Sequence, residues 1–118
     1  MEVEWSRLKA RELVELARKD AIVLVPIGAT EQHGPHLPLM TDHLMAETIA
    51  ARAAELTPER VDVLVAPVLP FGCSSHHLAV GGALTIGLRT YIAFLVDLGE
   101  SVAQMGGKRL LFLNGHGG

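Results

Sequence analysis

Carboxylate and imidazole side chains gather at two places in this 118-residue chain. Glu31 and His33 stand two residues apart in a segment that contains glycine and proline, and Asp42 follows shortly after. His116 lies between two glycines in the second place. Histidine nitrogens and carboxylate oxygens are the usual ligands of zinc, manganese and iron in hydrolytic centres. These four side chains are therefore the candidate metal ligands.

Each of these side chains also has an ordinary structural explanation. Asp42 stands where a helix is expected to begin, so a helix cap and a metal ligand are equally good interpretations of it alone. Glu31 or His33 taken alone would be a solvated loop residue, and a glycine-rich turn with a polar tip would explain His116. Because they follow apolar segments, together they favour a binding site.

The other histidines and the cysteine are weaker candidates. His36 and His43 rank behind the four residues above. The neighbours His76 and His77 should point in opposite directions if their backbone is extended, so at most one of them would reach a given site. Cys73 has small uncharged neighbours, which favours a buried structural thiol over a nucleophile.

The elements that must position these residues alternate between helix and strand. Apolar runs of strand length occur at 21–27, 61–68 and 109–113. Helical spacing of apolar residues occurs at 6–18, 41–56 and 88–105. The first apolar run carries no charge, as expected of a strand covered on both faces. The alternation predicts an α/β fold with a mainly parallel sheet.

All the candidate residues lie in segments that leave the carboxyl ends of the predicted strands. These segments are 28–42, 71–87 and 114–118. Ligands of open parallel sheets bind at that edge, so the side chains should converge. Three strands alone would leave long edges unpaired, which natural domains avoid. We therefore expect residues 1–118 to form a single α/β domain that is the amino-terminal part of a longer one.

Composition narrows the class of protein. The chain is 49% hydrophobic and 19% charged, which excludes disorder and indicates a compact core. The net charge of -3 and the lack of a basic run argue against nucleic acid and membrane surfaces as partners. The single cysteine allows no intrachain disulfide, and the acidic amino end does not resemble a signal peptide. We expect a cytoplasmic protein.

Two segments resemble a known family. Pro26–Leu39 reads PIGATEQHGPHLPL and is followed by Thr41-Asp42, which closely resembles the creatininase (creatinine amidohydrolase) family. Residues 114–118 read NGHGG and stand where that family has its second signature. The resemblance covers essentially the whole chain but only about the first half of a typical member. It implies a three-layer α/β/α metalloenzyme with two divalent ions (zinc, manganese or iron), often assembled as a hexamer.

The resemblance also implies roles for residues. Glu31 and His116 would help hold one ion and His33 the other, with Asp42 bridging them. Such ions lower the pKa of a bound water and polarise an amide carbonyl. Ser74 and His77 would contact the substrate. The general acid or base would lie beyond Gly118, so no catalytic residue is assigned.

This sequence departs from creatininase itself at two places. Gly118 stands where creatininase has a glutamate ligand, and the NGHGG form resembles the branch that includes the mycofactocin-system peptidase and formamide-hydrolysing members. A later glutamate could supply the missing ligand in that branch. Residues 80–83 read VGGA where the family usually has Phe-Pro-Gly-Thr, which would alter a loop or the substrate contacts. Specificity for creatinine therefore does not follow from the resemblance.

The function predicted from all this is a divalent-metal-dependent amidohydrolase. It would hydrolyse a C–N bond in a small cyclic amide, a formamide or a peptide, as a homo-oligomer. One alternative is a truncated or non-catalytic relative that keeps the fold and partial metal binding. Another is a plain α/β domain that binds a small molecule and whose histidines are incidental. Residues 1–118 alone are not expected to turn over substrate.

Overall fold

One parallel sheet organises the chain, and the computed structural model describes all residues from 1 to 118. The strands are β1 (Ile22–Ile27), β2 (Val63–Val65) and β3 (Arg109–Asn114). β1 lies between the other two, and both pairs are parallel, with Ile22 opposite Val63 on one side and Arg109 on the other. The prediction of a mainly parallel sheet is confirmed.

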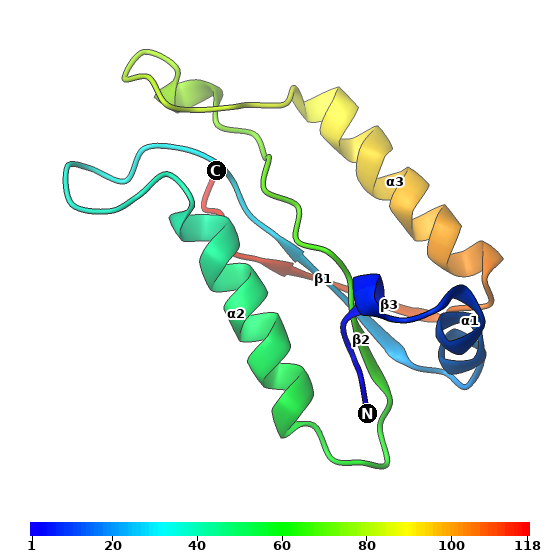
Figure 1. Ribbon diagram of the computed structural model, residues 1–118. Coiled ribbons are helices and arrows are strands. Elements are labelled where there is room, and N and C mark those ends of the chain that lie inside the picture. Colours follow the sequence, from blue (N-terminus) through cyan, green and yellow to red (C-terminus); the bar gives the residue numbers. More distant parts are fainter.

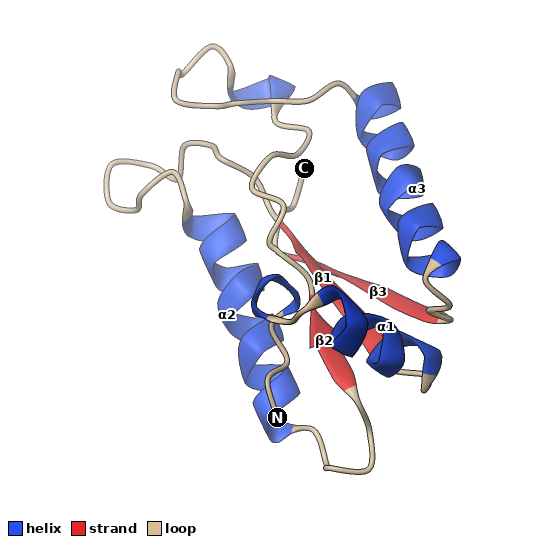
Figure 2. Cartoon of the chain, turned by 45° about the vertical axis from the view of Figure 1, so that its right-hand side comes forward, coloured by secondary structure: helices blue, strands red, loops and turns tan.

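Helices join the strands in the predicted alternating order. They are α1 (Ala10–Arg18), α2 (Thr41–Leu56) and α3 (Leu88–Gln104), with two 3₁₀ turns, η1 (Trp5–Arg7) and η2 (Ser75–His77). α2 covers one face of the sheet, and α1 and α3 cover the other (Figures 1 and 2). The predicted α/β/α layers are therefore confirmed.

The side chains on the two faces of β1 pack into two separate apolar cores. Val23 and Val25 point towards one face, where they pack with Leu13 of α1 and Val102 of α3. Leu24 points the other way. Because successive side chains of a strand alternate between faces, a strand covered on both sides must be apolar throughout. This explains why the segment carries no charged residue.

Small side chains let α2 lie close to the sheet. Ala50 and Ala54 are buried on the face of α2 that meets Leu24, Val63 and Val65. An alanine face allows a helix backbone to approach a sheet closely, because there is little side chain to separate them. The close approach also keeps the first turn of α2, where Asp42 lies, near the sheet.

The first helix differs from its prediction. It begins at Ala10 rather than at Ser6, because residues 5–7 form the separate turn η1 and Leu8 is extended. Trp5 and Leu8 both pack against the core. The carboxylate of Glu12 accepts a hydrogen bond of 2.9 Å from the backbone N–H of Lys9 and so marks the true start.

The strand predicted at 61–68 is also shorter in the structure, where β2 ends at Val65. Pro67 has no N–H to donate to a neighbouring strand. Pairing with β1 resumes at Leu69, whose N–H donates to the carbonyl of Pro26 over 2.9 Å. The chain thus continues beside β1 beyond the regular strand and carries the segment from Gly72 to the carboxyl end of the sheet.

The three segments that leave the strands meet at one end of the molecule (Figure 1). Gly28 lets the first turn of α2 pack on the end of β1, since a Cβ there would lie 2.5 Å from the Cα of His43. Gly115 plays the same part after β3, where a Cβ would lie 2.6 Å from the backbone oxygen of Asp42. The start of α2 is therefore held between the ends of two strands.

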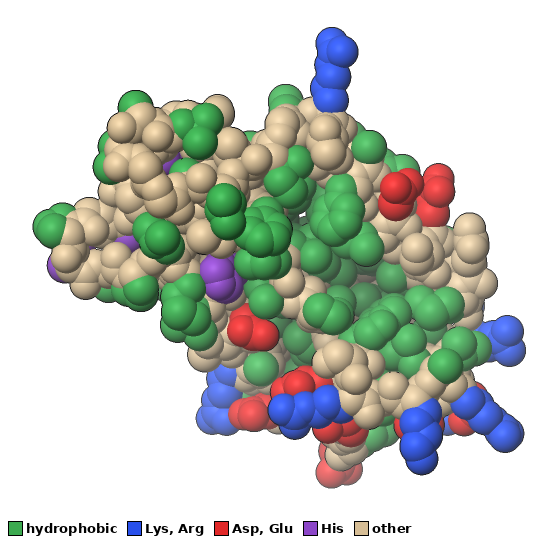
Figure 3. Space-filling model, turned by 45° about the horizontal axis from the view of Figure 1, so that its top comes forward, with side chains coloured by type: hydrophobic (Ala, Val, Ile, Leu, Met, Phe, Trp, Pro, Cys, Tyr) green, Lys and Arg blue, Asp and Glu red, His purple; other side chains and the backbone are tan.

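Part of the surface is strongly apolar. Figure 3 shows hydrophobic side chains gathered over a broad area, with many charged side chains near its margin. α3 buries only Val102, and large side chains on α3 and β3 remain exposed: Leu88, Ile92, Phe94, Val96 and Leu111. No helix has both the length and the apolar character needed to cross a membrane.

Candidate metal centre

Asp42 lies at the middle of the candidate site. It lies in the first turn of α2 and is only 5% exposed, and the N-cap residue of that helix is Met40. Its Oδ1 lies 2.8 Å from Nε2 of His33, and its Oδ2 lies 2.8 Å from Nδ1 of His116. One carboxylate thus joins imidazoles from two distant segments, which a simple helix cap would not do.

Glu31 adds a second buried carboxylate to the same cluster. It is 5% exposed, and its Oε1 lies 3.1 Å from Nδ1 of His116. Its Oε2 is buried and has no hydrogen-bond partner. A buried polar atom without a partner is costly, and for a carboxylate oxygen a cation is the natural partner. The donor set therefore fits a divalent metal ion.

His33 is oriented by the backbone beside it. Its Nδ1 lies 3.2 Å from the carbonyl oxygen of Glu31, which can accept a hydrogen bond from that nitrogen. With the proton on Nδ1, the lone pair of Nε2, which lies 2.8 Å from Oδ1 of Asp42, would be available to a metal ion. A histidine ligand commonly has its second nitrogen fixed in this way, because the bond sets both the tautomer and the ring direction.

His116 is fixed on three sides. The side-chain oxygen of Asn114 accepts a hydrogen bond from the backbone N–H of His116. The side-chain nitrogen of Asn114 donates one to the backbone carbonyl of His116, and both bonds are 2.9 Å long. Its Nε2 lies 3.0 Å from the carbonyl oxygen of Cys73. With Nε2–H donating there, Nδ1 faces both Asp42 and Glu31, in a position to bind a cation.

The electrostatic surroundings of His116 favour positive charge. Burial alone would lower its pKa, but the hydrogen bond to the Cys73 carbonyl and the carboxylates of Asp42 and Glu31 outweigh burial, and the pKa of His116 is raised. The same carboxylates that hold a proton on the imidazole would attract a metal ion. Metal binding would then release that proton.

The structure brings all four predicted ligands together. Donor atoms of Glu31, Asp42 and His116 lie within 4.8 Å of one another, and all three residues are buried. His33 joins them through Asp42. Two weaker candidates lie elsewhere: His36 is exposed, and Nδ1 of His43 lies 3.1 Å from the carbonyl oxygen of Ala29.

The two predicted substrate-binding residues also reach this end of the sheet. Ser74 is fully buried, and its Oγ lies 3.4 Å from Nε2 of His116. His77 is partly exposed; its Nδ1 lies 2.8 Å from the amide nitrogen of Gln32 and its Nε2 3.7 Å from Oε2 of Glu31. Cys73, expected to be a buried thiol, is only half-buried.

One expectation about this loop is wrong. His76 and His77 were expected on opposite sides of an extended segment, but both have donor atoms near Glu31. The reason is that residues 75–77 form η2, in which neighbouring side chains are about 120° apart rather than 180°. Their ring centroids lie 4.2 Å apart.

Sequence reasoning missed the residues that orient the ligands. Asn114 precedes a glycine, which favours a local side-chain turn, so its sequence contained a signal for the contacts with His116. Gln32 and the Cys73 carbonyl offered no comparable signal. Their contacts join residues 45 and 43 positions apart, so only the folded chain brings them together.

Comparisons with known proteins point to one family. Residues 6–118 match the creatininase family model, described as creatinine amidohydrolase. The chain is 42% identical over 99 residues to the mycofactocin precursor peptide peptidase of Mycolicibacterium smegmatis, which covers 82% of this chain and 40% of that protein. It is 31% identical over 120 residues to the creatinine amidohydrolase of Pseudomonas putida, covering 98% of this chain and 43% of that protein.

A solved structure shares the fold as well. The structure described as "Creatininase Mn" superposes with a TM-score of 0.85 at 28% identity, covering 98% of this chain and 46% of its own. The chain thus spans less than half the length of the relatives it matches. The family match extends over nearly all of the sequence, including both donor-bearing segments. This chain belongs to the creatininase family.

Proposed function

We propose that this chain belongs to a divalent-metal-dependent amidohydrolase that hydrolyses a C–N amide bond in a small cyclic amide, a formamide or a peptide. The observation that carries the proposal is the buried carboxylate of Asp42, whose two oxygens face His33 and His116 at 2.8 Å each. A carboxylate shared between two imidazoles is the arrangement expected of a bridging ligand. Bound divalent ions would polarise the amide carbonyl and acidify a water molecule.

In this proposal the four donors divide between two ions. Glu31 and His116 would help to hold one, His33 would help to hold the other, and Asp42 would contribute to both. The unpartnered Oε2 of Glu31 and the carboxylate-facing Nδ1 of His116 support the first assignment. Manganese, zinc and iron are the proposed metals, and a solved creatininase similar to this chain is described as a manganese form.

A peptide is the favoured substrate class among the three. The peptidase of M. smegmatis is 42% identical to this chain, whereas the creatinine amidohydrolase of P. putida is 31% identical. His77 is the better placed of the two proposed substrate contacts, because it is partly exposed whereas Ser74 is fully buried. The general acid or base is not among the residues assigned.

We also propose that residues 1–118 are the amino-terminal part of a longer creatininase-family domain, which works as a cytoplasmic homo-oligomer such as a hexamer. The share of the relatives' length that the chain covers and the exposed apolar side chains on α3 support this. The proposed partners are the amide or peptide substrate and further copies of the chain, not nucleic acid or membrane. Sedimentation of the full-length protein tests the oligomer.

Metal analysis of the full-length protein tests the enzyme proposal. Asp42→Asn is expected to lose two ions per chain and all hydrolysis of creatinine, formamide or a short peptide. Glu47→Gln, an exposed carboxylate on the same helix, is the matched control and should keep both. A folded protein that binds no divalent metal with Asp42 intact would overturn the proposal.

The same measurements separate the two alternatives. Asp42-dependent metal binding without hydrolysis of any of these substrates would indicate a non-catalytic relative. A folded protein that takes up small molecules but no metal would indicate a plain α/β binding domain.

A further inference from the structure

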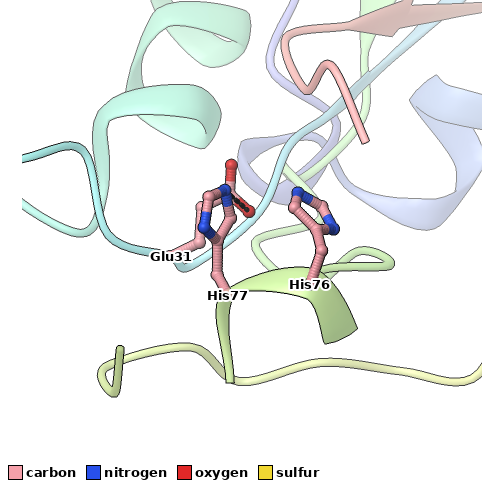
Figure 4. Close-up of side chains that lie close together, drawn as sticks. All are labelled: Glu31, His76 and His77. Carbon is pink, nitrogen blue, oxygen red and sulfur yellow. Dashed lines mark ion pairs between the residues drawn. The ribbon is translucent and has the colours of Figure 1, made fainter. Parts of the chain in front are cut away.

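A second group of donor atoms lies beside the Asp42 cluster. Figure 4 shows the imidazoles of His76 and His77 together with the carboxylate of Glu31. One donor atom of each residue lies within 4.8 Å of the others. The turn η2 places both histidines on this side of the loop, and Glu31 comes from the segment after β1.

The two oxygens of Glu31 face different neighbours. Oε1 lies 3.1 Å from His116, in the cluster already described. Oε2 is buried without a hydrogen-bond partner and lies 3.7 Å from Nε2 of His77. That separation is too long for a hydrogen bond. Two ligands of one tetrahedral zinc ion, each about 2.0–2.1 Å from it, are about 3.3 Å apart. Glu31 and His77 therefore need only a small approach, and all three donor atoms start within 4.8 Å of one another.

His76 completes the group from the solvent side. It is exposed, its ring centroid lies 4.2 Å from that of His77, and its ring stacks at 6.3 Å with His116. A Cβ at Gly118 would lie 2.8 Å from Cε1 of His76, so glycine at this position leaves the imidazole its room. Because His76 is exposed and Glu31 is buried, a hydrated cation could reach Glu31 from solvent past His76.

We propose that Glu31, His76 and His77 form a further divalent-cation site, separate from the one centred on Asp42. Two imidazole nitrogens and one carboxylate oxygen are a donor set typical of zinc, with a fourth position left for water or a substrate atom. The site shares Glu31 with the proposed enzyme centre but contains neither Asp42 nor His33. It therefore extends the metal chemistry beyond the ions of the proposed function.

Gln32 must adjust when the site fills. When His77 binds a cation through Nε2, its proton lies on Nδ1 and needs an acceptor. The amide nitrogen of Gln32 now lies 2.8 Å from that Nδ1, while its oxygen accepts from the Gly34 N–H over 2.8 Å. The amide must therefore turn to offer its oxygen to His77, which links cation binding to the loop at Gly34.

Cobalt titration of the full-length protein tests this site, because Co²⁺ bound by imidazole has visible absorption bands. We expect Asp42→Asn to retain one cobalt ion with such bands, and His76→Asn in that background to lose it. In the otherwise unchanged protein, His76→Asn should remove one ion per chain. Because loss of an outer-shell partner alone weakens metal binding about 10–100-fold, loss of this ligand should weaken it by at least about 10-fold.

His36→Asn is the matched control, since His36 is an exposed histidine outside the cluster. It should bind cobalt as the unchanged protein does, and circular dichroism should show that all variants fold. Cobalt binding by His76→Asn equal in number and affinity to the unchanged protein would overturn the site. That result would leave the Asp42-dependent ions intact, so it is distinct from failure of the proposed function.

Discussion

At the scale of single residues, His116 is the side chain that two buried carboxylates surround. Its imidazole lies between the carboxylates of Asp42 and Glu31, at 2.8 and 3.1 Å. Burial opposes the charged form, yet these carboxylates and the Cys73 carbonyl raise the pKa of His116 overall. In protein without metal, the folded state therefore binds this proton more tightly than the unfolded state does.

This difference predicts a pH dependence of stability in chelator-treated protein. The contribution of protonated His116 to the free energy of unfolding is fully present below the ordinary histidine pKa of about 6.5. It is lost as the pH rises through the raised pKa of the folded protein. Urea unfolding of the unchanged protein and of His116→Gln should therefore differ most at low pH and less as the pH rises. A difference that grows with pH would contradict this.

Gly115 is a second residue whose effect can be measured. A Cβ there would meet the backbone oxygen of Asp42 at 2.6 Å, a contact that no side-chain movement relieves. Gly115→Ala should therefore displace Asp42 and weaken zinc binding, measured by calorimetry, by about 10–100-fold. Gly117→Ala is the control, since a Cβ at Gly117 meets nothing within 4 Å. Equal affinities in the two variants would show that Asp42 tolerates the shift.

At the scale of elements, the parallel sheet is the support on which the site depends. Leu64 of β2 is fully buried beside Val23 and Val25. Leu64→Ala should lower the free energy of unfolding by about 2–5 kcal/mol in urea titration, because it removes apolar contacts and leaves a cavity. Leu56→Ala, at a 69% exposed position at the end of α2, should change it by no more than about 0.5 kcal/mol.

Short elements decide where the candidate site residues of the loops lie. Pro67 ends β2 early, but pairing at Leu69 carries the chain on to Ser74. The turn η2 then sets His76 and His77 side by side. The early end of β2 and the turn η2 each involve only a few residues. Neither changes the helix and strand periodicity of the sequence, so periodicity does not predict them.

At the scale of the whole molecule, the donors join segments far apart in the sequence. Asp42 and His116 are 74 positions apart, and Glu31 comes from the segment after β1. An ion held by all three would tie the start of α2 to the ends of β1 and β3. Such an ion stabilises the folded state, because the unfolded chain does not hold these donors together.

Metal removal should therefore destabilise the full-length protein. An ion present at 100 times its Kd adds about 2.7 kcal/mol to the free energy of unfolding. A chelator should lower the melting temperature of the unchanged protein, as followed by calorimetry, and zinc should restore it. Asp42→Asn should respond much less to either addition. If the melting temperature of Asp42→Asn moved as far, the ion would be bound away from Asp42.

The sequence by itself determined the order of the elements and indicated the candidate donors. An uncharged apolar run can be stable only when covered on both faces, so β1 and its parallel neighbours were predictable, as was the edge at which the polar segments emerge. The local spacing of Glu31, His33 and Asp42 was enough to mark a candidate metal site. These features depend on neighbouring residues, whose geometry follows from the chain itself.

Only the tertiary structure decided what each donor faces. It placed the two oxygens of Asp42 against different histidines, left one oxygen of Glu31 without a partner, and turned both His76 and His77 towards it. Side-chain direction in a loop depends on contacts with residues tens of positions away. Those contacts exist only once the sheet has brought the three segments to one edge.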